Sequence, residues 1–429
     1  MTMTMSTALL TDHYELTMLQ AALRSGAAHR RAVFEVFARH LPGGRRYGVV
    51  AGTGRVLDEL LRFRFGEEEL TYLRECQVVD EPTLEFLADY RFSGNVYGYR
   101  EGDLYFPASP IMVVEGTFAE AVLLETLILS ILNHDCAIAS AASRMTNAAG
   151  KRPIIEMGSR RTHENAAVAA ARAAYIAGFA STSNLMAGHV YGIPTAGTAA
   201  HAFTLLHDSE REAFEAQIAS LGPETTLLVD TYDVAAAVRT AVELAGPKLG
   251  AVRIDSGDLA AAAQEVREQL DALGAFSTRI LVTSDLDEYA IAALAAAPVD
   301  GYGVGTSLVT GSGVPTAALV YKLVARDTAT GRLDAVAKRS VGKPSRGGRK
   351  EAYRLLDAAG HVETELVVTS GAVPEGGIPL LHELVRDGEV VGAEPLAAAR
   401  ERHAGAVATL PLEALHLGRG YAAIPTEFA

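Results

Sequence analysis

The feature that most constrains the fold is a repeat that begins at Arg152. From there, short apolar runs alternate with alanine-rich segments of helical periodicity, and the pattern returns about every 25 residues. The runs expected to be strands are RPIIEMG, FASTSN, IPTAGT, TTLLVD, GAVRIDSG, RILVTSD and DGYGVGTS. The segments expected to be helices include ENAAVAAARAAYIAGF, DVAAAVRTAVELAG, DLAAAAQEVREQLDALG and DEYAIAALAAAP. This alternation predicts a parallel sheet, either closed into a β/α barrel or open and doubly wound.

Polar residues at the ends of the expected strands favour the barrel. They are Gly158 to Arg161, Ser183, Asn184, Thr198 to His201, Asp230, Arg253, Asp255, Ser284, Asp285 and Gly303 to Thr306. Barrel enzymes gather their sites from the carboxyl ends of many strands, whereas an open sheet concentrates its site at one switch point. We therefore predict an α/β fold built on an irregular, TIM-like β/α barrel, with one pocket at the strand ends.

The flanking regions predict a second α/β body. Residues 1–150 contain an alternating strand pattern, AVFEVFARHL, two amphipathic helices, GRVLDELLRFRF and EPTLEFLADYRF, and a long apolar helix from Phe118 to Gly150 that leads into a barrel at residues 151–316. Segments of β type return in residues 317–429, where we expect them to pack on the N-terminal domain. KRSVGKPSRGGRK is predicted to be a mobile loop, and EGGIPLLHELVRDGEVVG is either a docking arm or part of the domain's closure.

Composition narrows the class of protein. With 49% hydrophobic and 21% charged residues, the chain has ordinary globular usage, and its apolar stretches are too interrupted to predict a membrane span. The first residues lack the basic and apolar blocks of a signal peptide. Cys76 and Cys136 form no CxxC pair, which predicts neither a disulfide nor a zinc site and favours the cytoplasm. A formal net charge of -14 argues against general nucleic-acid binding.

Two stretches point to an anionic ligand. GYGVGTSLVTGSG offers backbone N–H groups without Cβ obstruction, which suits a phosphate, although such turns are as often structural. It is not a GxGxxG, and no GxxxxGK[ST] occurs, so neither dinucleotide nor P-loop binding is predicted. EMGSRRTHE places Arg160 and Arg161 at a strand end, where the alternative is a solvated basic tip.

Arg253 and Asp255, in RIDSGDL, lie two residues apart on a strand and so share a face. Side by side they could hold a sugar phosphate, with the carboxylate accepting hydroxyl hydrogens or helping to hold a metal. The alternative is an ion pair followed by a helix N-cap at Asp258. His201, in GTAAHAF, follows another strand of the same ring. Its imidazole could act as base, nucleophile or ligand, or could be a hydrogen-bonded structural histidine.

An ordered set of motifs resembles one family, the nicotinate phosphoribosyltransferases. The motifs are LTDHYELTM, FEVFARHLP, EGTFAEAVLLETLIL, EMGSRRTHE, STSNLMAG, GTAAHAF, LVDTYDV, VRIDSGDL, VTSDLDEY and GYGVGTSLVTGSGVPTAALVYKLV. The resemblance implies that nicotinate and 5-phosphoribosyl-1-pyrophosphate give nicotinate mononucleotide and pyrophosphate, a step of NAD salvage, with coupled ATP hydrolysis and Mg²⁺. It also implies an incomplete or irregular barrel beside an N-terminal α/β domain, and a homodimer with its active site at the subunit interface.

The resemblance assigns roles to individual residues. His201 matches a histidine that ATP phosphorylates, and Arg160 matches an arginine that meets the phosphates. Asp255 falls where ribose hydroxyls and metal are met, and Tyr14 looks like a tyrosine that stacks on the pyridine ring across the dimer. The other implied contacts are Met157, Ser183, Thr198, Arg253, Ser284, Asp285, Gly303, Gly305 and Thr306, with Mg²⁺ held through Asp255 and Asp285.

The sequence departs from the family's pattern at two positions. Met157 stands where relatives often carry an aromatic residue, and its thioether can still pack on a ring face. Ser183 stands where nicotinamide-using relatives carry an aspartate, which would repel the carboxylate of nicotinate. We therefore expect nicotinate to be the substrate. The alternatives are a nicotinamide-using transferase, a quinolinate-using transferase, which would need a more basic pocket, and an inactive phosphosugar or nucleotide sensor.

Overall fold

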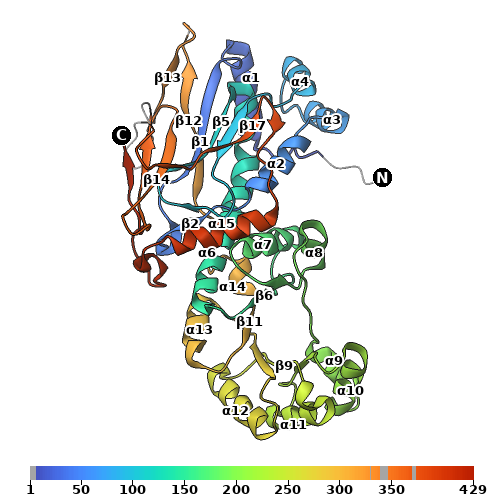
Figure 1. Ribbon diagram of the computed structural model, residues 1–429. Helices are drawn as coiled ribbons and strands as arrows, with labels where there is room; N and C mark the ends of the chain where they lie inside the picture. The colour runs from blue at the N-terminus through green and yellow to red at the C-terminus, as the bar shows by residue number, and fades with distance from the viewer. Residues whose placement is uncertain (1–5, 329, 339–345, 370–372) are drawn as a thin grey trace. The chain divides into compact units, whose positions relative to one another are not determined.

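The chain folds into two compact units, as a computed structural model of residues 6–328, 330–338, 346–369 and 373–429 shows. The first unit combines Met1–Ser140 with Val314–Ala429, and the second is Ala141–Gly313 (Figure 1). Both ends of the chain therefore contribute to the first unit. The mobile loop predicted at KRSVGKPSRGGRK falls mainly on residues 339–345, which lie outside the described residues.

The main sheet of the first unit is antiparallel and has β1 (Arg31–Ala38) near its middle, between β12 and β5. The other strands are β12 (Leu319–Asp327), β13 (Leu333–Ala335), β5 (Pro110–Thr117), β3 (Asn95–Gly98), β17 (His382–Arg386) and β18 (Glu389–Val390). We expected β1 to alternate between buried and exposed residues, but seven of its eight residues are buried. Phe34 and Val36 enter the main core, and Val33 on the opposite face packs in a smaller core.

The polar side chain in this buried strand has a buried partner. The Nζ atom of Lys350 lies 2.6 Å from Glu35 Oε2, and it also donates to the carbonyl oxygens of Arg346 and Gly348. Burial raises the pKa of Glu35, and the nearby Lys350 ammonium opposes that rise. Because an unpaired charge would be costly at this depth, β1 can lie centrally only when Lys350 is in place.

The C-terminal segment that sequence patterns left open completes this sheet. EGGIPLLHELVRDGEVVG forms β16 (Ile378–Pro379) and the β17–β18 hairpin, and β17 pairs with β3. The segment therefore closes the domain and is not a docking arm. A second sheet has the order β16, β14 (Glu351–Leu356), β15 (Val362–Val368) and β19 (Thr426–Phe428), and β2 (Gly48–Val49) pairs with β4 (Leu104–Tyr105).

Six helices accompany these sheets in the N-terminal part of the chain, among them a long apolar one. They are α1 (His13–Ser25), α2 (Thr53–Arg62), α3 (Glu67–Glu75), α4 (Glu81–Ala88), α5 (Phe118–Val122) and α6 (Glu125–Ala149), and α15 (Leu396–Ala408) follows near the C-terminus. The predicted long helix is interrupted by a turn at Leu123 and Leu124. Phe118–Ala149 is long and apolar enough to cross a membrane, but 67% of its most apolar window is buried within the protein, as in a core helix.

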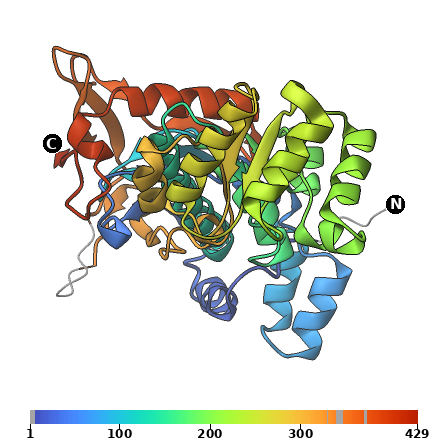
Figure 2. The same cartoon turned by 90° about the horizontal axis from the view of Figure 1, so that it is seen from below.

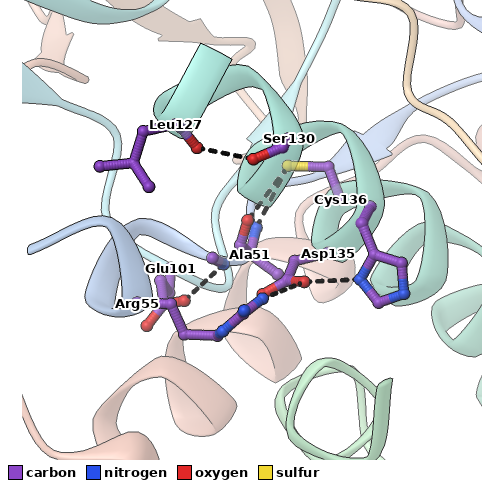
Figure 3. A network of polar contacts seen from close by, with 9 residues as sticks. Ala51, Arg55, Glu101, Leu127, Ser130, Asp135 and Cys136 are labelled. Carbon is purple, nitrogen blue, oxygen red and sulfur yellow. Dashed lines mark hydrogen bonds and ion pairs between the residues drawn. The ribbon is translucent and has the colours of Figure 1, made fainter. Parts of the chain in front are cut away.

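A buried polar network fixes α6 to the loop before α2 (Figure 3). The carboxylate of Asp135 accepts from Arg55 at 2.9 Å and contacts His134 Nδ1 at 2.7 Å. Cys136 lies on the same turn, and its Sγ accepts from the backbone N–H of Ala51. Gly52, the next residue, donates to a Glu101 oxygen at 2.7 Å. The loop's backbone groups are thus satisfied although they are buried.

The second unit contains one parallel sheet of six strands. Their order is β7 (Ser181–Thr182), β6 (Ile154–Glu156), β11 (Gly301–Val304), β10 (Arg279–Val282), β9 (Ala251–Ile254) and β8 (Thr226–Leu228). The structure describes every residue of this unit, and β7 and β8 are free edges, so the predicted barrel is not closed. IPTAGT, predicted to be a strand, forms only a bridge between Thr195 and Thr182, since Pro194 offers no N–H for pairing.

Helices connect these strands as the sequence predicts. They are α7 (Glu164–Ile176), α8 (Leu185–Tyr191), α9 (His201–Leu206), α10 (Glu210–Leu221), α11 (Val234–Ala245), α12 (Leu259–Ala272), α13 (Glu288–Ala293) and α14 (Thr306–Val309). Aspartates cap several of them: Asp233, Asp258 and Asp287 accept from backbone N–H groups of α11, α12 and α13. Helices α10 and α11 lie side by side (Figure 2). Each cap ends a loop that follows a strand, and so fixes the loop's length.

Stability should depend on pH through Glu15, a fully buried residue of α1. Burial raises its pKa from 4.5 to about 7, although Thr11 and Thr126 donate hydrogen bonds that lower it. The folded protein therefore binds this proton more tightly than the unfolded chain, so this contribution is complete below pH 4.5 and is lost as pH rises through 7. Relative to Glu15→Gln, we expect wild-type unfolding free energy to fall by up to about 3 kcal/mol between pH 5 and pH 8.

Denaturant melts of both proteins at several pH values measure this difference. Glu85→Gln, which changes an exposed glutamate of α4, is the control and should follow wild type at every pH. Parallel curves for wild type and Glu15→Gln would contradict the prediction.

Candidate active site

His201 begins α9 and is partly exposed, with 39% of its side chain accessible. Its Nδ1 atom lies 3.1 Å from the hydroxyl oxygen of Thr231. Its Nε2 atom lies 3.8 Å from Asp230 Oδ1 and 3.8 Å from Asp255 Oδ2. Two carboxylates beside Nε2 favour a proton on that nitrogen, because an N–H can point toward them, and leave the lone pair on Nδ1.

Asp230 joins the ends of two strands beneath this imidazole. Its Oδ2 atom accepts from the backbone N–H of Asp255 at 2.9 Å and from the hydroxyl of Ser256 at 2.7 Å. Its Oδ1 atom is buried and accepts no hydrogen bond from the described residues. A buried carboxylate oxygen without a donor is costly, and this one is directed at His201 Nε2. The arrangement is suited to orienting an imidazole that changes its charge.

Positive charge gathers at the same strand ends. Arg253, in β9, donates to the hydroxyl of Thr198, and its Nε atom is buried with no partner among the described residues. Burial lowers the pKa of Arg253, the nearby Asp255 and Asp230 carboxylates raise it, and Arg160 lowers it further. Arg160 is thus close enough to Arg253 for mutual repulsion, and the pair is suited to an anion.

Glycines allow two strand-end loops to approach closely. A Cβ atom on Gly303 would lie 2.4 Å from Thr283 Cγ2 and 2.7 Å from Met157 Sδ, and one on Gly158 would lie 2.2 Å from Val309 Cγ1. Gly305 lies over the carbonyl of Met157, where a Cβ would be 3.2 Å from the oxygen. Larger residues at Gly303 or Gly158 would force these loops apart.

Ser284 and Asp285 follow β10 and are exposed. Ser284 has a φ of 143°, which residues with a side chain rarely adopt. Such strain persists where the surrounding structure holds it, and it is common at functional sites. The preceding residue, Thr283, supplies part of that support because its hydroxyl donates to Asp255 Oδ1.

Glu156, at the end of β6, is a buried carboxylate in this region. It accepts from the backbone N–H of Gly158 and the hydroxyl of Thr182. Burial raises the pKa of Glu156, and these two hydrogen bonds oppose the rise. Among the described residues it forms no ion pair, so hydrogen-bond donors alone offset the cost of its burial.

Metal ligation by protein groups is limited in the described part of the chain. No group of three or more His, Cys, Asp or Glu side chains there is close enough to hold a metal ion. Mg²⁺, however, is commonly held by one or two carboxylates together with substrate phosphates. A Mg²⁺ ion held in that second mode would need no cage of protein ligands.

Known proteins of similar sequence identify the family. A model of the nicotinate phosphoribosyltransferase N-terminal domain matches residues 9–133. A nicotinate phosphoribosyltransferase of Mycobacterium tuberculosis H37Rv is 59% identical over 430 residues, which cover 98% of this chain and 94% of that protein. The chain belongs to the nicotinate phosphoribosyltransferase family. A Bacillus subtilis nicotinate phosphoribosyltransferase is 38% identical over 83% of this chain and 74% of its own length.

A solved structure of a family member has the same fold. Human nicotinic acid phosphoribosyltransferase superposes with a TM-score of 0.84 at 27% identity, covering 98% of this chain and 97% of that one. The nicotinate-nucleotide pyrophosphorylase of Pyrococcus furiosus superposes with a TM-score of 0.78 at 26% identity, covering 94% and 95%. The mixed α/β fold expected from the family is therefore confirmed.

In the present chain, most of the predicted site residues lie in the second unit. Those of the second unit are Met157, Arg160, Ser183, Thr198, His201, Arg253, Asp255, Ser284, Asp285, Gly303, Gly305 and Thr306. Most lie near or just after the end of a strand, but Thr198 and His201 do not follow a strand as predicted: they follow the isolated bridge at Thr195, and His201 begins α9. Tyr14 belongs to the first unit, where it lies on α1 with 44% of its surface exposed. Its predicted stacking on a ligand stays a prediction.

Sequence reasoning assigned no role to four residues that surround the predicted set. Asp230, Thr231, Glu156 and Thr182 have side chains that contact site residues or the loops that carry them. Asp230 was noted only as a strand-end residue. A carboxylate that ends the apolar run RPIIE was the available signal for Glu156, and nothing in the sequence marked Thr182.

The contact between Asp230 and His201 predicts a tautomer. We expect Asp230→Asn to favour the Nδ1–H tautomer, because an amide N–H in place of Oδ1 would donate to Nε2. NMR spectra of protein labelled with ¹⁵N-histidine report which nitrogen carries the proton, and His201→Gln assigns the signal. Asp208→Asn, at an exposed aspartate, is the control. Identical His201 shifts in wild type and Asp230→Asn would refute the assignment.

Proposed function

We propose that this protein is a nicotinate phosphoribosyltransferase that forms nicotinate mononucleotide and pyrophosphate from nicotinate and 5-phosphoribosyl-1-pyrophosphate, with coupled ATP hydrolysis. The observation that carries the proposal is the position of His201, which contacts Asp230, Asp255 and Thr231 at the same strand ends as Arg253. Family membership supplies the substrates, since the 59% identical relative is a nicotinate phosphoribosyltransferase.

Phosphoribosyl transfer sets two tasks for the protein. As the bond between the sugar C1 and pyrophosphate breaks, positive charge develops on the sugar and negative charge on the leaving group, while the pyridine nitrogen forms the new bond to C1. Arg160 would neutralise the departing phosphates. The loop of Gly303, Gly305 and Thr306 would hold the 5-phosphate through backbone N–H groups, and Asp255 and Ser284 would meet the ribose hydroxyls.

Nicotinate binding would use the buried arginine. A carboxylate facing Arg253 would supply the partner that its Nε atom lacks, and Thr198 already holds one guanidinium nitrogen in place. Met157, beside Gly303, would pack against the pyridine ring. Tyr14 of a second subunit would cover the other face of the ring, as the family resemblance implies.

ATP would phosphorylate His201 on Nδ1. The Nδ1 lone pair would attack the γ-phosphorus as the bond to ADP breaks, and the resulting imidazolium would keep its Nε2 proton facing Asp230 and Asp255. An anionic phosphoryl group on Nε2 would instead face those two carboxylates. Mg²⁺ would be held through Asp255 and Asp285 together with substrate phosphates, and when bound it would neutralise phosphate charge.

A homodimer would explain the exposed apolar residues on two helices of the second unit, α8 and α9. Leu185, Met186 and Val190 of α8 and Leu205 and Leu206 of α9 are all more than half exposed. Surfaces of this kind in a soluble enzyme are commonly covered by a partner. Sedimentation velocity would give the number of subunits, and a monomer at micromolar concentration would count against a shared site.

The proposed reaction is tested by incubating the protein with Mg²⁺, phosphoribosyl pyrophosphate and nicotinate or nicotinamide, with and without ATP, and measuring the mononucleotide by mass. We expect product from nicotinate, formed faster with ATP. His201→Asn should carry no acid-labile phosphate after incubation with ATP and should lose the stimulation. Product from nicotinamide alone would favour the other transferase, and no product from either would favour a sensor.

Ser183 should determine the choice of substrate. Ser183→Asp places a carboxylate near that of nicotinate, so we expect kcat/KM for nicotinate to fall at least about tenfold by like-charge repulsion. Ser183→Asn, which has a similar size without the charge, should lose much less. Steady-state kinetics with both variants measure the difference, and equal losses would show that size and not charge is responsible.

A further inference from the structure

Four side chains and two backbone N–H groups close a ring of hydrogen bonds between two strand-end loops. Glu156 accepts from the N–H of Gly158 and from the hydroxyl of Thr182. The hydroxyl oxygen of Thr182 accepts from the N–H of Asn184 at 2.9 Å. The side-chain amide of Asn184 donates to Ser159 Oγ at 3.0 Å, and Ser159 is the neighbour of Gly158. The ring therefore runs from one loop to the other and back.

The backbone reinforces the ring at its buried end. Glu156 pairs with Thr182 across β6 and β7, and the N–H of Ser183 donates to the Glu156 carbonyl oxygen at 2.8 Å. Thr182 also exchanges backbone hydrogen bonds with the next loop, through Pro194 O and the N–H of Ala196. Both Glu156 and Thr182 are buried, at 1% and 0% exposure, so water cannot replace a lost partner.

The ring brackets the residues that would meet substrate. Ser183 lies between the ring members Thr182 and Asn184 and is itself exposed, so its hydroxyl is available to a ligand. Met157 lies between Glu156 and Gly158, and Arg160 directly follows Ser159. A change in the ring would move the residues proposed for the pyridine ring, its substituent and the phosphates together.

We propose that Glu156 and Thr182 are positioning residues of the active site, which lock the loop carrying Met157 and Arg160 to the loop carrying Ser183. The inference rests on the proposed function, because its consequence is read in substrate binding. An isolated buried carboxylate is an expensive way to stabilise a strand end, and apolar residues would pack there at lower cost. The placement of Glu156 is explained by its two hydrogen-bond donors, one in each loop: the N–H of Gly158 and the hydroxyl of Thr182.

The experiment compares Thr182→Val with Thr182→Ser. Valine keeps the volume but removes the hydroxyl that donates to Glu156 and accepts from Asn184, whereas serine keeps both hydrogen bonds. We expect Thr182→Val, which loses both hydrogen bonds, to raise KM for nicotinate about tenfold and to relax discrimination against nicotinamide. Thr182→Ser should restore wild-type values.

Thr278→Val is the matched control. Thr278 is likewise buried in the second unit, at 1% exposure, and its hydroxyl donates to the Leu249 carbonyl at 3.0 Å, at the amino end of β10. It should lower the melting temperature as Thr182→Val does without changing KM. If the two valine variants behave alike in both readouts, Thr182 is only structural and the proposal is wrong.

A fourth variant keeps the proposal testable if Thr182→Val misfolds. Ser159→Ala breaks the ring at its more accessible end, removing the acceptor of the Asn184 amide, and should raise KM for nicotinate at an unchanged melting temperature. An unchanged KM would overturn the proposal even if Thr182→Val does not fold. Absence of any activity in the wild-type enzyme would instead refute the proposed function, so the two failures are distinguishable.

Discussion

Parallel pairing of six short strands is the constraint on which the site depends. Parallel strands end at the same edge of their sheet. Residues as many as 150 positions apart, such as Glu156 and Thr306, therefore lie at the same edge because of the strand pairing alone. The strands themselves are only two to four residues long. Loops that follow such short strands need their own polar contacts to hold a defined shape, and the site is built from those contacts.

Buried carboxylates supply most of that order. Asp230 ties the end of β8 to the end of β9 and faces His201, while Glu156 ties the end of β6 to that of β7. Among the described residues, Glu156 is buried without an ion pair, and Asp230 has a buried oxygen that accepts no hydrogen bond, and both features cost stability. Two carboxylates of the first unit, Asp135 and Glu35, are also buried, but each has a cationic partner. Glu15 of the first unit is likewise buried without a cation and has only Thr11 and Thr126 as donors in the described part of the chain, so burial without a cation does not by itself mark a substrate site.

Much of this arrangement could be predicted from the sequence, for identifiable reasons. Apolar runs bounded by glycine and aspartate predicted β6, β8, β9, β10 and β11, because buried parallel strands are continuous hydrophobic runs. That the barrel stays open could not be predicted from the periodicity of the sequence. It follows from Pro194, which limits pairing to one bridge, and from the two-residue length of β7. Residues with a motif, such as His201 and Arg253, were found, whereas Thr182 was not, since its importance lies in a contact with a residue 26 positions away.

The division of the chain has a consequence for its biosynthesis. Strand β1 is completed by β12, and the Glu35 carboxylate inside it by Lys350, a residue 315 positions later. A ribosome releases the N-terminal segment long before either partner exists, whereas all six strands of the parallel sheet come from one continuous stretch. The second unit can therefore fold while synthesis continues. The first unit cannot be completed until β12 and Lys350 have been made, and until then the edge of β1 and the Glu35 carboxylate lack their partners. Chaperones that shield exposed strands would be needed during that interval.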